Sequence, residues 1–175
     1  MTNSTSNSIE NLKDLLTKHY DIKEFEEPIA LQLAFNIDKE SALDALAFLK
    51  SQGFGQLSLL TCIDWIESGQ FQLVYILMNW DNGIHLQLRT FLDRDKPVFK
   101  TIQHIYPGVK YYERDVHEFF GVEFEGNEES YQHLFLEMWT ADPPMRKDFD
   151  PVKYSDDKYS MREYTTEFPT KIGGK

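Results

Sequence analysis

The sequence has a single cysteine, Cys62, among its 175 residues. A disulfide needs two thiols, and a self-contained iron–sulfur cluster needs about four thiolates. The chain by itself can therefore form neither. A lone cysteine most often lies buried in the protein interior, and we expect Cys62 to be a buried thiol in a strand. Such a composition fits a reducing, cytoplasmic setting.

Long apolar runs are also missing. No stretch approaches the roughly 20 apolar residues that span a bilayer. The best candidate, residues 71–80, is short and is interrupted by Gln72. The first ten residues, MTNSTSNSIE, contain no basic region followed by an apolar segment, so they do not predict a secretory signal. We expect this chain to reach a membrane only through a partner.

Basic charge is scarce. The chain has 18 Lys and Arg against 29 Asp and Glu, which gives a formal net charge of −11. Nucleic-acid binding normally needs a cluster of basic side chains to displace the counterions of the phosphates. The sequence therefore predicts no nucleic-acid partner.

The common catalytic motifs are absent as well. The chain contains no G-x-S-x-G, no G-x-x-x-x-G-K-[ST], no G-x-G-x-x-G and no H-E-x-x-H. From the residues alone we predict no active site.

Hydrophobic periodicity predicts four strands, with helices before, between and after them. Asp81-Asn82-Gly83 separates two strands, and Asn-Gly tolerates the positive φ angles of a hairpin turn. Strands are expected at residues 29–36, 56–63, 71–80 and 84–92. Helices are expected at residues 9–19 with Ser8 as the N-cap, at 39–52 between Asp38 and Gly53, and as a short piece at 97–105.

These elements predict an α+β fold, a two-layer α/β sandwich with a mainly antiparallel four-stranded sheet. Residues 1–8 are rich in Ser, Thr and Asn and are expected to be disordered, and residues 9–126 are expected to form the α/β domain. Residues 127–175 combine four prolines with scattered aromatic side chains and show no sustained period. We expect them to form an extended, irregular C-terminal docking arm.

The densest cluster of charges and aromatics is YYERDVHEFFGVEF, residues 111–124. We expect a helix that ends at Gly121, after which Val122 and Phe124 point inward. Its charged face is either simply solvated or offered to a neighbour. The apolar stripe of this helix would consist of Tyr112, Val116, Phe119 and Phe120.

A metal site is the competing interpretation of this cluster. Glu113 and His117 stand four residues apart, on one face of a helix. That spacing suits a charge-assisted pair as well as two metal ligands. A free-standing metalloenzyme that uses His117 and the nearby carboxylates therefore stays open as an alternative of another class.

Residues 113–126 resemble the signature of the C-type subunit of respiratory complex I, the proton-pumping NADH:quinone oxidoreductase. The signature reads roughly E-R-E-x-x-D/E, two apolar or aromatic residues, then G-[IV]-x-F-x-G. CIDW at 62–65, the hairpin from residue 71 and PPMRKDFDP at 143–151 also resemble this family, so the likeness covers about residues 28–151. The chain departs from the pattern at Asp115, where the family has Glu, and at 127–136, where the family usually continues G-H-P-D-L-R-R.

The resemblance implies a non-catalytic structural subunit that carries no cofactor itself. The family's protein sits in the peripheral arm on the cytoplasmic side of the inner membrane, where it scaffolds electron transfer from NADH to quinone. Its neighbours are the D-type subunit, which is related to the hydrogenase large chain, and iron–sulfur subunits. Iron–sulfur clusters and FMN are expected in these partner subunits. Homologous subunits also serve membrane-bound [NiFe] hydrogenases, formate hydrogenlyases and F420H2-type dehydrogenases, which stay open as alternatives.

By the same resemblance, Glu113, Arg114 and Glu118 would orient the signature helix, while Arg146, Lys147 and Asp148 would dock the tail. The residues expected to form the signature and its interface are Glu113, Arg114, Asp115, Glu118, Phe119, Phe120, Gly121, Phe124, Gly126, Arg146, Lys147 and Asp148.

Overall fold

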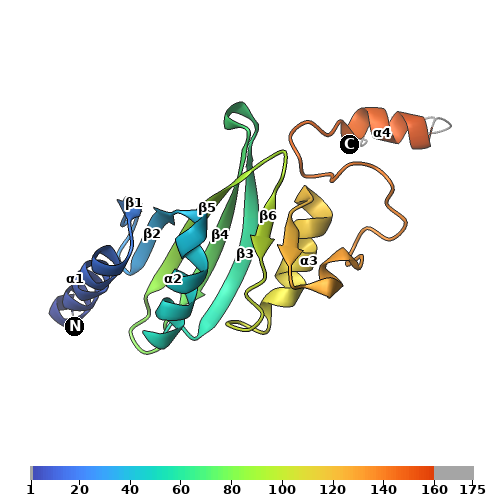
Figure 1. Ribbon diagram of the computed structural model, residues 1–175. Helices are drawn as coiled ribbons and strands as arrows, with labels where there is room; N and C mark the ends of the chain where they lie inside the picture. The colour runs from blue at the N-terminus through green and yellow to red at the C-terminus, as the bar shows by residue number, and fades with distance from the viewer. Residues whose placement is uncertain (1, 160–175) are drawn as a thin grey trace, which may run out of the picture.

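The computed structural model describes residues 2–159 of the chain, and Figure 1 shows the arrangement of its elements. Longer helices and strands make up most of residues 2–120, and one short strand and two short helices separated by irregular chain follow. In chain order the elements are α1 (Thr2–His19), β1 (Ile22–Glu26), β2 (Gln32–Ile37), α2 (Lys39–Ser51), β3 (Gln56–Trp65), η1 (Ile66–Ser68), β4 (Gln70–Met78), β5 (His85–Asp93), β6 (Val98–Lys100), α3 (Val109–Phe120), β7 (Glu123–Glu125), η2 (Glu128–Tyr131) and α4 (Pro151–Lys158).

The main sheet has five strands in the order β1-β2-β5-β4-β3, and it is mixed because β2 and β5 run parallel. The sheet thus has five strands and not the four that were expected. It is mainly antiparallel, as expected, because the pairs β1–β2, β4–β5 and β3–β4 are antiparallel, and the α+β class holds. The added strand, β1, is short, and its pairing with β2 is interrupted between Lys23 and Glu26. Such a strand shows little alternation in sequence. The pairing of β2 with β5 joins segments far apart in the chain, so no local pattern reveals it.

One face of the sheet forms the core. A row of fully buried side chains crosses four strands: Leu60 pairs with Tyr75, Tyr75 with Leu88, and Leu88 with Phe35. In Figure 1, α2 lies across this sheet and α3 lies beside β3. Each large apolar side chain buried in this way contributes roughly 1.5–3 kcal/mol. Cys62, also on this face, is a buried thiol in β3 as expected, and burial raises its pKa to about 12.

The hairpin and the helix that starts at Lys39 form as predicted. Strands β4 and β5 pair antiparallel from Gln70 opposite Asp93 to Met78 opposite His85, and Gly83 adopts a φ of 71° in the turn. Helix α2 buries Ala42, Ala45, Leu46 and Leu49. Asp38 occupies the N-cap position, but its side chain pairs with Lys23 instead of capping the helix.

Two local predictions are wrong. Helix α1 begins at Thr2, so Ser8 is not its N-cap and residues 2–8 lie within a helix. Ser, Thr and Asn cost only a few tenths of a kcal/mol each in a helix, which lets a helix anchored by buried Leu12 and Leu16 extend through them. The predicted helix at 97–105 does not form: residues 98–100 are strand β6, which pairs parallel with β7, and turns follow at 103–105. Tertiary pairing here overrides the helix-start signal of Pro97.

Among residues 2–159, none of the helices combines the length and the apolar character needed to cross a membrane. The division of the chain into an α/β domain and a docking arm stays a prediction, and residues 160–175 lie outside the described part of the chain.

Candidate interaction site

Helix α3 carries the apolar stripe that the sequence predicts. Val116 and Phe120 are buried, while Tyr112 and Phe119 are partly buried against the core. The Phe120 ring meets the ring of Phe71 edge-on, with centroids 6.1 Å apart. The Tyr112 hydroxyl donates a hydrogen bond of 2.9 Å to the carbonyl of Ser58 on the edge strand β3. Both the sheet face and the sheet edge thus hold α3 in place.

Glu113 lies inside the protein rather than on a charged outer face. Its side chain is fully buried. The carboxylate accepts hydrogen bonds from the Thr101 hydroxyl at 2.8 Å, the Ile102 amide at 3.0 Å and the Asn127 side-chain amide at 2.8 Å. Burial raises the pKa of Glu113 above its ordinary value, although these hydrogen bonds act in the opposite direction. Glu113 therefore ties α3 to the chain that follows β6 and β7, and the expectation of a fully charged outer face is corrected at this residue.

Arg114 and Glu118 hold the segment 132–136 against α3. Arg114 donates to the carbonyl oxygens of Gln132, at 3.1 Å, and His133, at 2.8 Å. The Glu118 carboxylate accepts from three consecutive backbone amides, at 2.8–3.1 Å, those of Leu134, Phe135 and Leu136. Burial would raise the pKa of Glu118, but these amides and His133 hold it below the ordinary range. Glu118 and Arg114 together form what we call the arm clamp.

A second set of polar contacts fixes the chain near residue 148. The Arg94 guanidinium bonds both carboxylate oxygens of Asp64, at 2.8 and 3.1 Å, and one oxygen of Asp148 at 2.7 Å. Asp64 also accepts from the backbone amide of Lys147 at 2.8 Å. The Asp64 side chain is only 2% exposed. Burial would raise the pKa of Asp64, but Arg94 and the Lys147 amide lower it below its usual value. We call Asp64, Arg94 and Asp148 the latch.

Arg146 and Lys147 complete the contact between the tail and the sheet. The Arg146 guanidinium lies 5.3 Å from the centroid of the Phe71 ring, and its Nη2 donates to the Arg94 carbonyl at 3.3 Å. The Lys147 ammonium lies 5.9 Å from the Trp65 ring centroid. These residues dock residues 143–148 onto the chain's own sheet. That they also contact another protein stays a prediction.

The remaining signature residues lie in α3 and β7 or are the glycines that follow these two elements. The Phe119 ring lies 6.1 Å from that of Phe135, and Phe124 is buried in β7. Asp115 is partly buried, and its pKa is raised by burial and by the neighbouring Glu118. Gly121 ends α3 with a φ of 78°, as predicted. Gly126 has a φ of 91°, and a Cβ there would lie 2.9 Å from Thr101.

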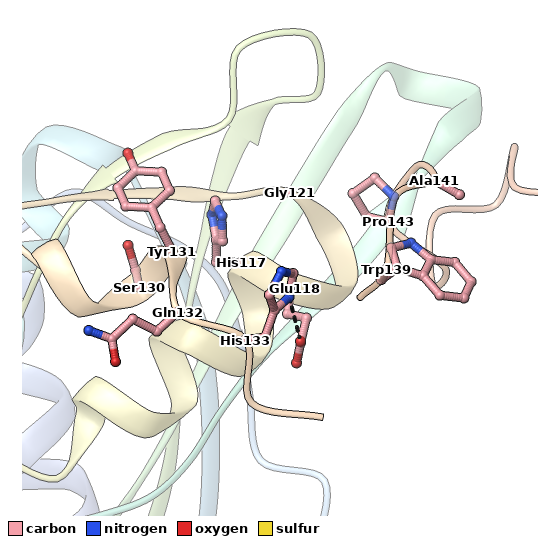
Figure 2. A pocket seen from close by; sticks show the side chains of 10 residues that line it. All are labelled: His117, Glu118, Gly121, Ser130, Tyr131, Gln132, His133, Trp139, Ala141 and Pro143. Atoms are coloured by element: carbon pink, nitrogen blue, oxygen red, sulfur yellow. Dashed lines mark hydrogen bonds and ion pairs between the residues drawn. The ribbon is translucent and has the colours of Figure 1, made fainter. Parts of the chain in front are cut away.

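A pocket of about 280 Å³ lies between α3 and residues 130–143 (Figure 2). His117 Nδ1 lies 2.8 Å from the Val122 carbonyl oxygen, and its ring contacts Tyr131 edge-on at 4.8 Å. His133 Nδ1 lies 3.3 Å from the Glu118 carboxylate, and Figure 2 marks this pair. The lining residues are His117, Glu118, Gly121, Ser130, Tyr131, Gln132, His133, Trp139, Ala141 and Pro143.

The metal interpretation finds no support in this geometry. Glu113 bonds Thr101, Ile102 and Asn127, whereas His117 bonds the Val122 carbonyl. Within residues 2–159, no three His, Cys, Asp or Glu side chains are grouped so that they could hold a metal ion.

The sequence did not single out Arg94 or Asn127 as site residues, and it indicated Asp64 only as part of the CIDW segment. Asp64 belongs to the CIDW segment but reads equally well as a loop residue, and Arg94 stands in no motif. Asn127 directly follows the signature, yet its burial at 2% exposure becomes visible only in the fold. The side chains that complete each network come from distant elements, so spacing in the sequence could not group them.

The segment after β7 exposes many apolar side chains. Trp139, Phe149 and Tyr154 pack their rings together, with centroid distances between 4.5 and 5.8 Å. The large hydrophobic residues exposed in this segment are Tyr131, Phe135, Met138, Met145, Val152 and Tyr159. Exposed apolar groups gathered in one segment are typical of a surface that contacts another protein.

Residues 35–155 match the protein family described as the respiratory-chain NADH dehydrogenase, 30 Kd subunit. The chain is 26% identical over 126 residues to the C subunit of F420H2 dehydrogenase of Methanosarcina mazei, which covers 71% of this chain and 78% of that protein. It is 32% identical over 117 residues to C/D subunit 2 of the NADH-quinone oxidoreductase of Aquifex aeolicus. That match covers 66% of this chain and only 20% of the longer relative.

A solved structure shows a similar fold. It is the structure of the membrane-bound sulfane sulfur reductase, described as an archaeal respiratory membrane complex. One of its chains superposes with a TM-score of 0.77 at 34% identity, and the match covers 95% of this chain and 99% of that one. The similarity to known proteins therefore extends from the sequence to the three-dimensional fold.

Proposed function

The chain belongs to the family of the 30 Kd subunit of respiratory-chain NADH dehydrogenase, and from this membership we propose that it is a non-catalytic structural subunit of a complex I-type oxidoreductase. In this role it scaffolds the neighbouring subunits that pass electrons from NADH through iron–sulfur clusters to quinone. The complex translocates protons, and the chain sits in its peripheral arm on the cytoplasmic side of the membrane.

The observation that carries this proposal is where the signature side chains point. Glu113, Arg114 and Glu118 all bond to groups of the chain itself, and so do the latch residues Asp64 and Arg94. The polar groups are used to fix the arm, and the arm in turn exposes apolar side chains. This arrangement suits a scaffold that presents a shaped surface to its neighbours.

The partner that we propose is the D-type subunit. The relative from Aquifex aeolicus is named a C/D subunit, and this name places a region like this chain and a D-type region in one polypeptide. Fusion of two proteins favours a direct contact between their unfused counterparts. We further propose that iron–sulfur subunits lie nearby and that FMN and the iron–sulfur clusters belong to the partners.

A second candidate differs only in the complex. The likeness to the sulfane sulfur reductase chain extends over 95% of this chain, at 34% identity. The likeness to the C subunit of F420H2 dehydrogenase covers 78% of that protein. These matches favour an equivalent subunit in a membrane-bound respiratory complex whose electron donor or acceptor is not NADH or quinone.

Purification of the tagged chain from host membranes in mild detergent tests both candidates. We expect D-type and iron–sulfur subunits to co-purify in a fixed ratio, and we expect the isolated chain to show no oxidoreductase activity. NADH-binding flavin subunits, together with NADH:quinone activity of the complex, would support the first candidate. Their absence from a complex that still contains the D-type subunit would support the second.

The isolated chain provides the contradicting outcome. If the purified chain alone reduced quinone with NADH, the scaffold proposal would be wrong. It would also be wrong if the tagged chain left the membranes without any oxidoreductase subunit.

A further inference from the structure

The turn at Leu136–Trp139 holds an exposed methionine in an unusual backbone conformation. The Trp139 amide donates to the Leu136 carbonyl at 3.1 Å, which closes the turn. Met138 within it has a φ of 60°, a left-handed value that costs a side-chain-bearing residue about 1–2 kcal/mol. The residue is 90% exposed, so packing within the chain does not offset this cost. Strain at an exposed site of this kind is typical of a functional contact.

The chain is held firmly on both sides of this turn. Before it, the arm clamp fixes the backbone through Glu118, which accepts the amides of residues 134–136. After it, the Trp139 ring packs 4.5 Å from the ring of Tyr154, and its indole nitrogen donates to the Asp142 carbonyl at 3.0 Å. Because the turn is fixed before any partner arrives, little conformational entropy is lost when Met138 binds.

The surroundings of the turn are apolar and acidic. Phe135, three residues before Met138, is 67% exposed. Glu137 and Asp142 are also exposed on either side of Met138. Residues 127–145 contain four acidic residues and no lysine or arginine. A complementary surface would therefore combine an apolar socket with a basic border.

We propose that the Leu136–Trp139 turn is the anchor of the arm, and that Met138 and Phe135 insert into an apolar socket bordered by Lys and Arg on the neighbouring D-type subunit of the same complex. This inference rests on the proposed function for the existence of that neighbour. A flexible, polarisable methionine side chain adapts well to such a socket.

Two substitutions at position 138 separate binding from strain. Met138→Ala removes the side chain beyond Cβ but keeps a Cβ at positive φ. Met138→Gly removes the Cβ as well, and with it the backbone strain. Each variant, with a tag, replaces the wild-type chain in the host, and the D-type subunit retained per tagged chain is measured over stepwise increases in NaCl. We expect both variants to retain at least tenfold less partner than the wild type. In isolation, Met138→Gly should melt at or above the wild-type temperature, which shows that the loss is not one of folding.

Trp80→Ala is the matched control, since Trp80 is also a large exposed hydrophobic residue, 70% exposed, and belongs to the β4–β5 turn and not to the arm. It should retain the partner as the wild type does. If both Met138 variants retained the partner as well as the wild type does, the proposal that this turn is the anchor would be wrong, and the proposed function would be unaffected. If the wild-type chain retained no oxidoreductase subunit, the proposed function would fail and the anchor with it.

Discussion

Glu113 shows, at the scale of a single residue, how a buried charge can organise several segments. Its carboxylate meets donors from Thr101, Ile102 and Asn127, which lie beyond the ends of β6 and β7. A buried carboxylate is tolerated only where such donors replace water. Once it is in place, the Ile102 amide and the Asn127 side-chain amide depend on it in the same way, because each would otherwise be buried without a partner.

We predict that Glu113→Ala destabilises the protein strongly. Each buried donor left unpaired costs about 1–3 kcal/mol, so the loss from the Ile102 amide and the Asn127 side-chain amide together should be about 2–6 kcal/mol. Urea unfolding should show this as a lower midpoint with an unchanged slope.

Glu113→Gln serves as the matched control, because its amide keeps the shape and one acceptor oxygen. Its midpoint should lie between those of the wild type and the alanine variant. Equal midpoints for the alanine and glutamine variants would show that the donors do not depend on the carboxylate.

At the scale of elements, the end of α3 sets the position of the arm. Gly121 adopts a φ of 78°, which lets the chain turn directly from α3 into β7. The close approach of Pro143 depends on the same glycine, since a Cβ at Gly121 would lie 3.2 Å from Pro143 Cγ. The helix end and the docking of residues 143–148 thus share one requirement for glycine.

We predict that Gly121→Ala destabilises the protein by about 1–2 kcal/mol, because alanine is strained in the left-handed region. It should also raise the hydrogen-exchange rate of residues 143–148. Gly55→Ala is the matched control, since Gly55 has no positive φ and no atom within 4 Å of a built Cβ. That variant should unfold within about 0.5 kcal/mol of the wild type. Equal stability of the two alanine variants would contradict the role of Gly121.

At the scale of the whole molecule, the latch joins the arm to the sheet, because residues from β3, the end of β5 and the arm meet there. Asp64 and Arg94 are nearly buried, while Asp148 is half exposed. Removing one partner from such a buried pair leaves the other charge uncompensated, which costs about 3–5 kcal/mol. The path of the arm therefore depends on charges that the sheet supplies.

Acid should release the arm before it unfolds the sheet. The pKa values of Asp64 and Glu118 lie below their ordinary values of 3.8 and 4.5. Such carboxylates contribute their full stabilisation above the ordinary pKa and lose it as the pH falls through the lowered one. The contribution of Glu113 to stability depends on pH in the opposite direction. Its pKa is raised above 4.5, so its protonation on acidification favours the folded core. Hydrogen exchange measured as the pH is lowered below about 4 should show residues 132–150 opening while residues 70–93 stay protected.

Asp64→Asn provides the control for this pH dependence. In that variant residues 143–148 should exchange rapidly already at pH 7, whereas residues 132–136, which Glu118 holds, should keep their protection. Simultaneous opening of arm and sheet in the wild type would contradict the separate release.

The sequence by itself determined the elements with strong periodicity. The β4–β5 hairpin follows from alternation around Asn-Gly, and α2 and the stripe of α3 follow from helical spacing. The role of Gly121 was predictable, because the residue that ends a helix in the left-handed conformation is usually glycine. The signature around Glu113 was visible as a family resemblance, which the match over residues 35–155 confirms.

Only the tertiary structure decided where the charges of the signature point. Segments distant in sequence are joined by three sets of contacts: the hydrogen bonds of buried Glu113, those of Glu118 to three backbone amides, and the ion pair of Asp64 with Arg94. The parallel pairing of β2 with β5 and the strand at 98–100 have the same origin. Local patterns report which face of an element is apolar, whereas the partner of a buried charge depends on which elements the folded chain brings together.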